Sequence, residues 1–274
     1  MSAAAREALE GGRQALTGYA KRVKPDTLRK VADEILSVRD LLAAEPRLRR
    51  ALTDPGRPGD DRANLAEQVL SGKVSSGALK VIVALVKGRW STPGELRTGL
   101  ETLGVDAWLS AGAADGVLGD VEDELFRFGQ VVSGDSELAV ALTDSTASVE
   151  SRVSLVRALL EGKATSTTIR LVELAVAGFG GRRFDSGLRR LLELCAEKRE
   201  QRLAYVTVAT LLSSDQESRL ADKLSEIYGQ PVAVKLTVDP QVIGGIRVQI
   251  GHDLYDGTVA RRLTEAKKAL AGGR

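Results

Sequence analysis

The sequence predicts a mainly α-helical protein with a small α+β domain near its C-terminal end. Over most of the first 200 residues, apolar side chains recur every three or four positions, which is the spacing of amphipathic helices. This helical pattern occurs twice, with a period of 90 residues. From about residue 201 the apolar side chains alternate instead, as in half-buried strands. We therefore expect two tandem helical bundles followed by a β-α-β-β-α unit.

Composition excludes several classes of protein. With 43% hydrophobic and 28% charged residues, the 274-residue chain is expected to fold rather than stay disordered. The net charge of +2 and the aromatic content of 4% are not typical of a nucleic-acid-binding protein, for which a basic face with aromatic stacking groups is expected. The single cysteine, Cys195, cannot form an internal disulfide and fits a reducing compartment. Neither a membrane span nor a signal peptide is recognisable, so a cytoplasmic location is expected.

The first bundle is predicted from helical periodicity and from helix-breaking residues. Proline ends or precedes several of the segments, and Gly72 is placed to close one of them. Predicted helices with both ends assigned cover residues 3–23, 47–53, 77–86 and 93–103. Two further helices are predicted, one that carries Leu28 to Leu42 and stops before Pro46, and one that carries Ala63 to Leu70 and is closed by Gly72.

The pattern then begins again. Shifting the sequence by 90 places residues 31–34 (VADE) on VEDE and residues 51–54 (ALTD) on ALTD. Without any gap, residues 28–90 and 118–180 share 17 identities in 63 positions, where chance gives about four to five. A period of 90 is too long for a solenoid repeat, so two globular bundles are expected. The predicted domains are residues 1–110, 111–200 and 201–274.

The last domain is predicted from alternating strands and from turn residues. A strand is predicted from a partly alternating run of apolar residues, which are Leu203, Tyr205, Val206, Val208 and Leu211. Ser214 and Glu217 have the spacing of a capping box, and Gly229 is placed to end the helix that follows.

Two more strands and a closing helix follow. Val232 to Val238 and Ile246 to Ile250 alternate as strands, and Pro240 ends the first of them. Between the two strands, Gly244 and Gly245 permit a turn or a close backbone approach. Asp256-Gly257 is a turn, and Thr258 can cap a helix whose apolar face includes Val259 and Leu263.

No set of residues predicts catalysis, a metal site or a cofactor site. His252 is the only histidine and follows a glycine in a predicted turn, where exposure is expected. Cys195 has the spacing of a buried helix face, so a core thiol is expected. The acidic run Glu122-Asp123-Glu124 predicts a solvated helix face. Gly72-Lys73 and Gly162-Lys163 lack the other residues of a phosphate-binding loop and are interpreted as helix ends. The chain is therefore not expected to be an enzyme.

An ordered set of residues near the C-terminal end carries a family resemblance. It resembles the C-terminal signature of the delta subunits of F-type ATP synthases, the oligomycin-sensitivity-conferring protein family. The matching residues are Asp239, Ile243, Gly244, Gly245, Ile246, Gly251, Asp256, Gly257, Thr258, Arg262 and Leu263. The duplicated bundle departs from the usual single-bundle pattern and resembles the delta proteins of actinobacteria, in a form not fused to a membrane-anchored stalk subunit.

The resemblance implies a non-catalytic stator subunit of a proton-translocating ATP synthase. Such a subunit would bind N-terminal helices of the alpha subunits through a helical bundle and the b-type peripheral stalk through its C-terminal domain. It would resist rotor torque, need no cofactor and lie peripherally at the cytoplasmic face of the cell membrane. The signature residues would belong to the stalk contact region. We assign the alpha contact to the first bundle, because it keeps an N-terminal helix. The alternative function is a helical RNA-binding or regulatory module.

Overall fold

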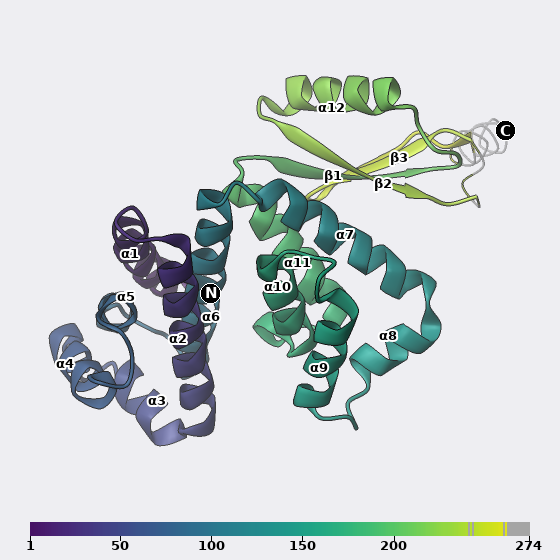
Figure 1. The fold of residues 1–274 in the computed structure, drawn as a ribbon. Coiled ribbons are helices and arrows are strands. Elements are labelled where there is room, and N and C mark those ends of the chain that lie inside the picture. Colours follow the sequence, from purple (N-terminus) through teal and green to yellow (C-terminus); the bar gives the residue numbers. More distant parts are fainter. Residues whose placement is uncertain (241, 243, 260, 262–274) are drawn as a thin grey trace, which may run out of the picture. The chain divides into compact units, whose positions relative to one another are not determined.

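The computed structural model describes residues 1–240, 242, 244–259 and 261, and Figure 1 shows their fold. The chain forms two compact units, residues 1–189 and residues 190–274. The first unit is built from helices, and the second contains a four-stranded sheet. The predicted fold class, mainly α with a small α+β part, is confirmed. The division of the chain into three domains stays a prediction.

The helical unit follows the predicted order of helices closely. Proline, which has no amide hydrogen to leave unpaired, begins α2, α3 and α6. Gly72 and Gly162 have φ values of 73° and 70° just after α4 and α9, so they end these helices as predicted. The helices are α1 (Ala3–Ala20), α2 (Pro25–Ala44), α3 (Pro46–Thr53), α4 (Gly59–Leu70), α5 (Ser76–Lys87), α6 (Pro93–Ala114), α7 (Leu118–Gly134), α8 (Ser136–Thr143), α9 (Val149–Leu160), α10 (Ser166–Val176), the 3-10 helix η1 (Phe179–Gly181) and α11 (Phe184–Lys198).

The 90-residue repeat is present in the structure as well as in the sequence. Helices α3 and α8 begin and end exactly one period apart, and so do α4 and α9. Side chains at equivalent positions are buried alike, since Leu52 and Leu142 are 1% and 0% exposed. Helices α2 to α5 of the first copy therefore recur as α7 to α10 of the second.

Helix α6 contributes to both copies. In the first copy it packs along α2, as Figure 1 shows. In the second copy it contacts α10, which is the counterpart of α5. Because α1 packs against α5 in the first copy, α6 occupies in the second copy the place that α1 has in the first. The start of α6 at Pro93 also lies one period after the start of α1 at Ala3.

The length of α6 differs from its predicted length. The sequence predicts an end near Leu103, but the helix spans 22 residues and ends at Ala114. Gly104 and Gly112 disfavour a helix in isolation, and packing outweighs that cost here. A Cβ added at Gly104 would lie 2.6 Å from Leu36 Cγ, and one at Gly112 would lie 3.1 Å from Leu118 Cδ2. The two glycines therefore allow neighbouring side chains to approach the helix closely.

The second unit contains a mixed sheet. Its elements are β1 (Arg202–Val208), α12 (Ser214–Tyr228), β2 (Val232–Val238), β3 (Ile246–Ile250) and β4 (Asp253–Asp256). The strand order is β2-β1-β3-β4, with β1 and β2 parallel and the other pairs antiparallel. Helix α12 connects β1 to β2, because neighbouring parallel strands need a crossover. β4 is a short fourth strand at the edge of the sheet, next to β3.

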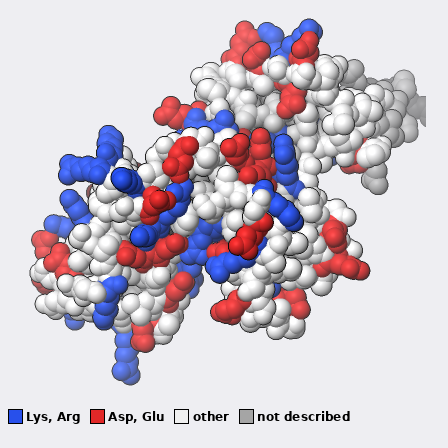
Figure 2. All heavy atoms as spheres, in the orientation of Figure 1, with Lys and Arg blue, Asp and Glu red and all other residues white. Residues whose placement is uncertain are grey.

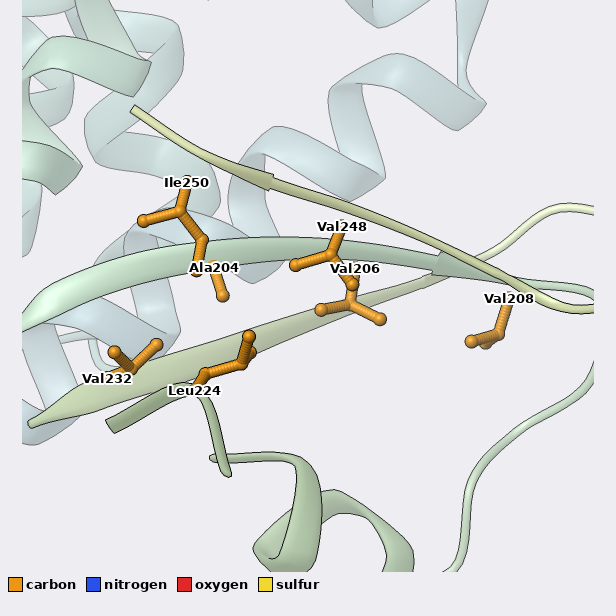
Figure 3. Close-up of a cluster of buried hydrophobic side chains, with 7 residues drawn as sticks. All are labelled: Ala204, Val206, Val208, Leu224, Val232, Val248 and Ile250. Carbon is orange, nitrogen blue, oxygen red and sulfur yellow. The ribbon is translucent and has the colours of Figure 1, made fainter. Parts of the chain in front are cut away.

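The core of this unit lies between the sheet and α12. Alternate side chains of β1, β2 and β3 point to the same face, and Leu224 of α12 packs against them, as Figure 3 shows. The buried cluster consists of Ala204, Val206, Val208, Leu224, Val232, Val248 and Ile250.

Two local predictions for this unit are wrong. Leu211 lies beyond the end of β1 and is 78% exposed. The N-cap of α12 is Ser213 rather than Ser214: Ser213 Oγ accepts a hydrogen bond from Gln216 N (3.3 Å), and Ser213 N donates to Gln216 Oε1 (2.9 Å). Glutamine at the third helical position closes a capping box as well as glutamate does, so the box is present one residue earlier.

Candidate functional site

The signature residues form a backbone clasp between the turn before β3 and the residues after β4. Gly244 and Gly245 have φ values of 63° and 82°, which are left-handed conformations that favour glycine. A Cβ added at Gly245 would lie 2.3 Å from the carbonyl oxygen of Gly257 and 2.9 Å from Thr258 Cα. No side chain fits into that space. The glycine pair thus makes the close backbone approach that its sequence predicts.

Hydrogen bonds hold the clasp closed. Val259 N donates to the carbonyl oxygen of Gly244 (3.2 Å), and Gly257 N donates to that of Ile246 (2.9 Å). Thr258 Oγ1 accepts a hydrogen bond from Arg261 N (3.3 Å). Thr258 therefore caps the helical residues that begin beside it, as predicted.

Asp256 is the charged residue of the clasp. Its carboxylate accepts hydrogen bonds from the side chain and the backbone of Thr258, which hold its pKa below the ordinary value, and Arg247 and Arg261 add to this effect. The distance from Arg247 Nε to Asp256 Oδ2 is 3.6 Å. The carboxylate is charged at neutral pH and tied to its own turn, so it acts as a structural anion.

The other signature residues have structural positions or lie outside the described part. Asp239 N donates to the carbonyl oxygen of Val208 (2.9 Å) and joins the ends of β1 and β2. Gly251 has a φ of 56° in the turn between β3 and β4. Ile243, Arg262 and Leu263 lie outside the described residues. The described signature residues organise backbone, and they form no acid–base pair.

Within the described residues, no group of three or more histidine, cysteine or acidic side chains could hold a metal ion. His252 is exposed and Cys195 is fully buried, as predicted for both. None of the helices described here has both the length and the apolarity to cross a membrane.

The burial and the capping role of several polar residues in the helical unit are not predicted from the sequence. The predicted solvated face of Glu122-Asp123-Glu124 is wrong at two of its three positions. Glu122 is 0% exposed, and Glu124 Oε2 accepts hydrogen bonds from Thr165 N (3.0 Å) and Thr168 Oγ1 (2.6 Å). Glu124 thereby caps the N-terminus of α10, where a negative charge is favoured. Only Asp123 is exposed.

Both copies of the repeat carry this cap. Glu34, one period before Glu124, accepts hydrogen bonds from the backbone N (3.0 Å) and the hydroxyl of Ser75 at the N-terminus of α5. The VADE and VEDE motifs that reveal the duplication thus include its shared capping residue. The glutamate that ends each motif could have been recognised as a cap from its sequence separation, because Glu34 precedes Ser75 by 41 residues and Glu124 precedes Thr165 by 41 residues.

An arginine also holds the fourth helix to the fifth in each copy. Arg62 of α4 is 4% exposed. It donates to backbone carbonyl oxygens at the end of α5, including those of Lys87 (3.2 Å) and Gly88 (2.7 Å). Arg152, its counterpart in α9, donates to the carbonyl oxygens of Leu142 (3.3 Å) and Val176 (3.1 Å). These arginines satisfy helix-end carbonyls that would otherwise lack partners.

The outer faces of α5 and α10 differ between the copies. On α5, Leu79 and Val83 are half-buried apolar side chains one helical turn apart. The residue of α10 equivalent to Val83 is Glu173. Glu173 is 4% exposed and accepts hydrogen bonds from Arg157 Nε (2.5 Å) and Arg170 Nη1 (2.8 Å). At the position of Val83, α5 therefore carries an apolar side chain, whereas α10 carries a buried carboxylate with two arginine partners.

The ionic face of α10 is also engaged by the first copy. Arg170 Nε donates to Asp33 Oδ1 of α2 (2.9 Å), and the same oxygen accepts a hydrogen bond from Trp108 Nε1 of α6 (3.1 Å). Glu101 of α6 makes a second contact of this kind. Its Oε1 accepts a hydrogen bond from Arg39 Nη1 (2.8 Å), and its Oε2 accepts one from Gly180 N (2.7 Å). These contacts join the two copies within the helical unit.

Known proteins resemble this chain along its whole length. A family model described as ATP synthase delta (OSCP) subunit matches residues 105–270. The proteins named ATP synthase subunit delta from Salinispora arenicola and Salinispora tropica are 53% and 51% identical to it over 270 residues, covering 98% of each chain. The protein of that name from Streptomyces griseus subsp. griseus is 42% identical, covering 99% of this chain and 100% of its own.

A chain in the cryo-EM structure of the Toxoplasma gondii mitochondrial ATP synthase hexamer is 16% identical, covers 63% of this chain and 97% of itself, and has a TM-score of 0.39. The similarity to the actinobacterial relatives, in contrast, includes both copies of the repeat.

Proposed function

The chain belongs to the ATP synthase delta (OSCP) subunit family, and from this premise we propose that it joins the catalytic head of the enzyme to its peripheral stalk. As a member of that family it is a stator component without a catalytic role. Its helical unit binds the N-terminal helices of alpha subunits, and its C-terminal unit holds a b-type stalk subunit. Held in this way, the chain lies peripherally at the cytoplasmic face of the cell membrane.

The outer face of α5 carries the assignment of the alpha contact to the first bundle. An amphipathic helix binds by placing its apolar side chains against an apolar groove or face. Leu79 and Val83 offer such a face at a spacing of one turn. The equivalent position in the second bundle holds Glu173, whose carboxylate is committed to two arginines.

The extent of the family match makes the second bundle the rival candidate. The match begins at residue 105 and covers the second bundle and the C-terminal unit. By sequence, the second copy is therefore the counterpart of the usual single bundle. The ionic face of α10 and its contact with Asp33 still favour the first bundle as the partner of an apolar helix.

A matched pair of variants tests this assignment. Val83→Glu introduces the residue that the second copy has at the equivalent position. We expect it to weaken binding of a synthetic alpha N-terminal peptide by about tenfold or more, because a carboxylate must then lose water at the contact. Ile169→Glu, at the position of α10 equivalent to Leu79, serves as the control and should leave the affinity unchanged. Titration calorimetry with the full-length chain measures both.

The reverse result would move the alpha contact to the second bundle. That result is a loss of affinity with Ile169→Glu and none with Val83→Glu. Circular dichroism at the working temperature shows whether each variant is folded. Point variants are preferable to deleting residues 1–105, because that deletion cuts α6, which belongs to both copies.

The stalk contact is tested at the clasp. Gly245→Val places a side chain where backbone atoms already lie 2.3 Å from a Cβ, so the clasp must open. We expect the variant to retain much less b-type subunit in a pull-down than the unchanged chain does. Gly229→Asn, outside the signature, is the control, because asparagine tolerates a positive φ and no atom lies within 4 Å of a Cβ there. Full retention of the b-type subunit by Gly245→Val would contradict this part of the proposal.

A further inference from the structure

The two copies carry opposite charge at the same corner of the bundle. Residues 45–57, from the end of α2 to the start of α4, contain four arginines and two acidic residues, a net charge of +2. Residues 135–147, one period later, contain three acidic residues and no basic residue, a net charge of −3. At equivalent positions, Arg47 corresponds to Glu137 and Arg50 to Val140. Figure 2 shows blue side chains projecting at α3 and red ones at the edge of α8.

Three arginines of the first corner are exposed, and we call Arg47, Arg50 and Arg57 the basic corner. Arg57 has an ion pair with Asp54 across 3.5 Å, with both side chains about half exposed. Such a pair contributes little to stability and leaves the corner open to another anion. The fourth arginine, Arg49, is used internally, since its Nη1 donates to the carbonyl oxygen of Leu42 at the end of α2 (2.8 Å).

A groove of about 480 Å³ opens beside this corner. Its apolar walls include Trp90, Pro55 and Pro93, and its charged lining residues are Arg50 and Asp54, the partner of Arg57. The indole is fixed, because Trp90 Nε1 donates to the carbonyl oxygen of Leu85 (3.2 Å) and the side chain is 6% exposed. The groove therefore combines a preformed apolar wall with a guanidinium group at its edge.

We propose that the basic corner and this groove bind an acidic segment of a partner protein, with one apolar side chain of that segment seated against Trp90 and Pro93. Guanidinium groups pair with carboxylates in a favourable planar geometry, which supplies the charge complementarity. A phospholipid headgroup would satisfy the arginines but would leave the apolar wall of the groove unfilled. This contact goes beyond the proposed function, because it adds a third attachment to the contacts at α5 and at the clasp.

Site-specific photocrosslinking in the assembled complex tests the inference. A benzophenone amino acid is placed at Ala51, which lines the groove, and in a separate variant at Ala141, its equivalent in the second copy. The tagged chain is isolated from the membranes of its own organism after illumination. We expect a protein adduct at position 51 whose crosslinked peptide is acidic and also contains an apolar residue. No such adduct is expected at position 141.

Charge reversal provides the second measurement. Arg47→Glu combined with Arg50→Glu should lower the yield of the adduct at position 51 by about tenfold, because both exposed arginines then repel an acidic segment. The mirror control, Glu137→Arg with Val140→Arg, changes the second corner and should leave the yield unchanged. All four side chains are exposed, so the fold is preserved in both variants.

The possible outcomes separate this inference from the proposed function. A basic crosslinked peptide, a lipid adduct, or the absence of any adduct at position 51 while synthase subunits copurify would overturn the inference alone. Failure of synthase subunits to copurify would contradict the proposed function. An acidic protein adduct at position 51 that depends on Arg47 and Arg50 would still support the basic corner in that case.

Discussion

The two helical copies agree in their interiors and differ on their surfaces. Each copy has a glutamate that caps its fifth helix, Glu34 or Glu124, and an arginine that ties its fourth helix to the end of the fifth, Arg62 or Arg152. The outer face of the fifth helix and the corner at the third helix, in contrast, have changed character. Polar groups required for folding are thus kept in both copies, while the exposed surfaces are suited to different neighbours.

The largest expected effect on stability comes from replacing the arginine that both copies share, Arg62 or Arg152. Arg62→Met removes a buried guanidinium that donates to several backbone carbonyls, and those oxygens lose their partners. We expect the free energy of unfolding to fall by about 3 kcal/mol. Arg152→Met removes bonds to two carbonyl oxygens, and we expect a loss of about 1.5 kcal/mol. Urea denaturation of the full-length variants measures both values.

Equal losses for the two arginine variants would show that the copies depend on these residues alike, despite their different numbers of hydrogen bonds. Arg89→Met is a suitable control, because Arg89 is an exposed arginine of the same unit. Its replacement should change the free energy of unfolding by less than about 0.5 kcal/mol.

The next effect concerns the capping glutamates. Glu124 accepts hydrogen bonds from a backbone amide and from the hydroxyls of Thr165 and Thr168, whereas Glu34 accepts bonds from the amide and hydroxyl of Ser75 alone. We expect Glu124→Ala to cost about 2 kcal/mol and Glu34→Ala about 1 kcal/mol. Thermal unfolding followed by circular dichroism tests the order. A larger loss with Glu34→Ala would contradict it.

The smallest effect concerns α1, whose place in the second copy is taken by α6. Ser2 N donates to Glu95 Oε1 (2.6 Å), and Ser2 Oγ donates to Glu95 Oε2 (3.1 Å), which joins the start of α1 to the start of α6. The backbone hydrogen bond from Ser2 is the main cause that lowers the pKa of Glu95 from its ordinary value of 4.5.

A lowered pKa in the folded state means that the carboxylate stabilises the protein above pH 4.5, and that this stabilisation is lost as pH falls through the lowered value. We expect Glu95→Gln to reduce the difference in stability between pH 6 and pH 3. Urea denaturation of both chains at the two pH values measures it. An unchanged difference would show that Glu95 does not hold α1 through its charge.

Much of the fold can be predicted from the sequence because periodicity and helix-breaking residues act locally. The helix ends at Gly72 and Gly162 and the turn at Gly244-Gly245 follow from residues that are close together in the chain, and the duplication follows from direct comparison of two segments of the sequence. The clasp is predictable for the same reason, since only glycine tolerates both the positive φ and the close approach found at Gly245.

The remaining features depend on distant residues. Glu122 and Glu124 have the pattern of a solvated run, but long-range packing buries one of them and pairs the other with Thr165, 41 residues away. The α6 predicted from the sequence is too short, because glycine is a poor helix former. In the structure Gly104 remains helical, and its missing side chain leaves the space that Leu36 occupies. The apolar face of α5 and the charge of the basic corner become meaningful only when the two copies are compared in space.

The participation of α6 in both copies has a consequence for the cooperativity of unfolding. A helix of 22 residues is about 33 Å long, and neither bundle keeps its core if this helix melts. The repeat is therefore smaller than the unit that unfolds, and calorimetry should record one transition for residues 1–189 instead of a separate transition for each bundle. Because the two homologous copies share this helix, we expect them to unfold together as one cooperative unit.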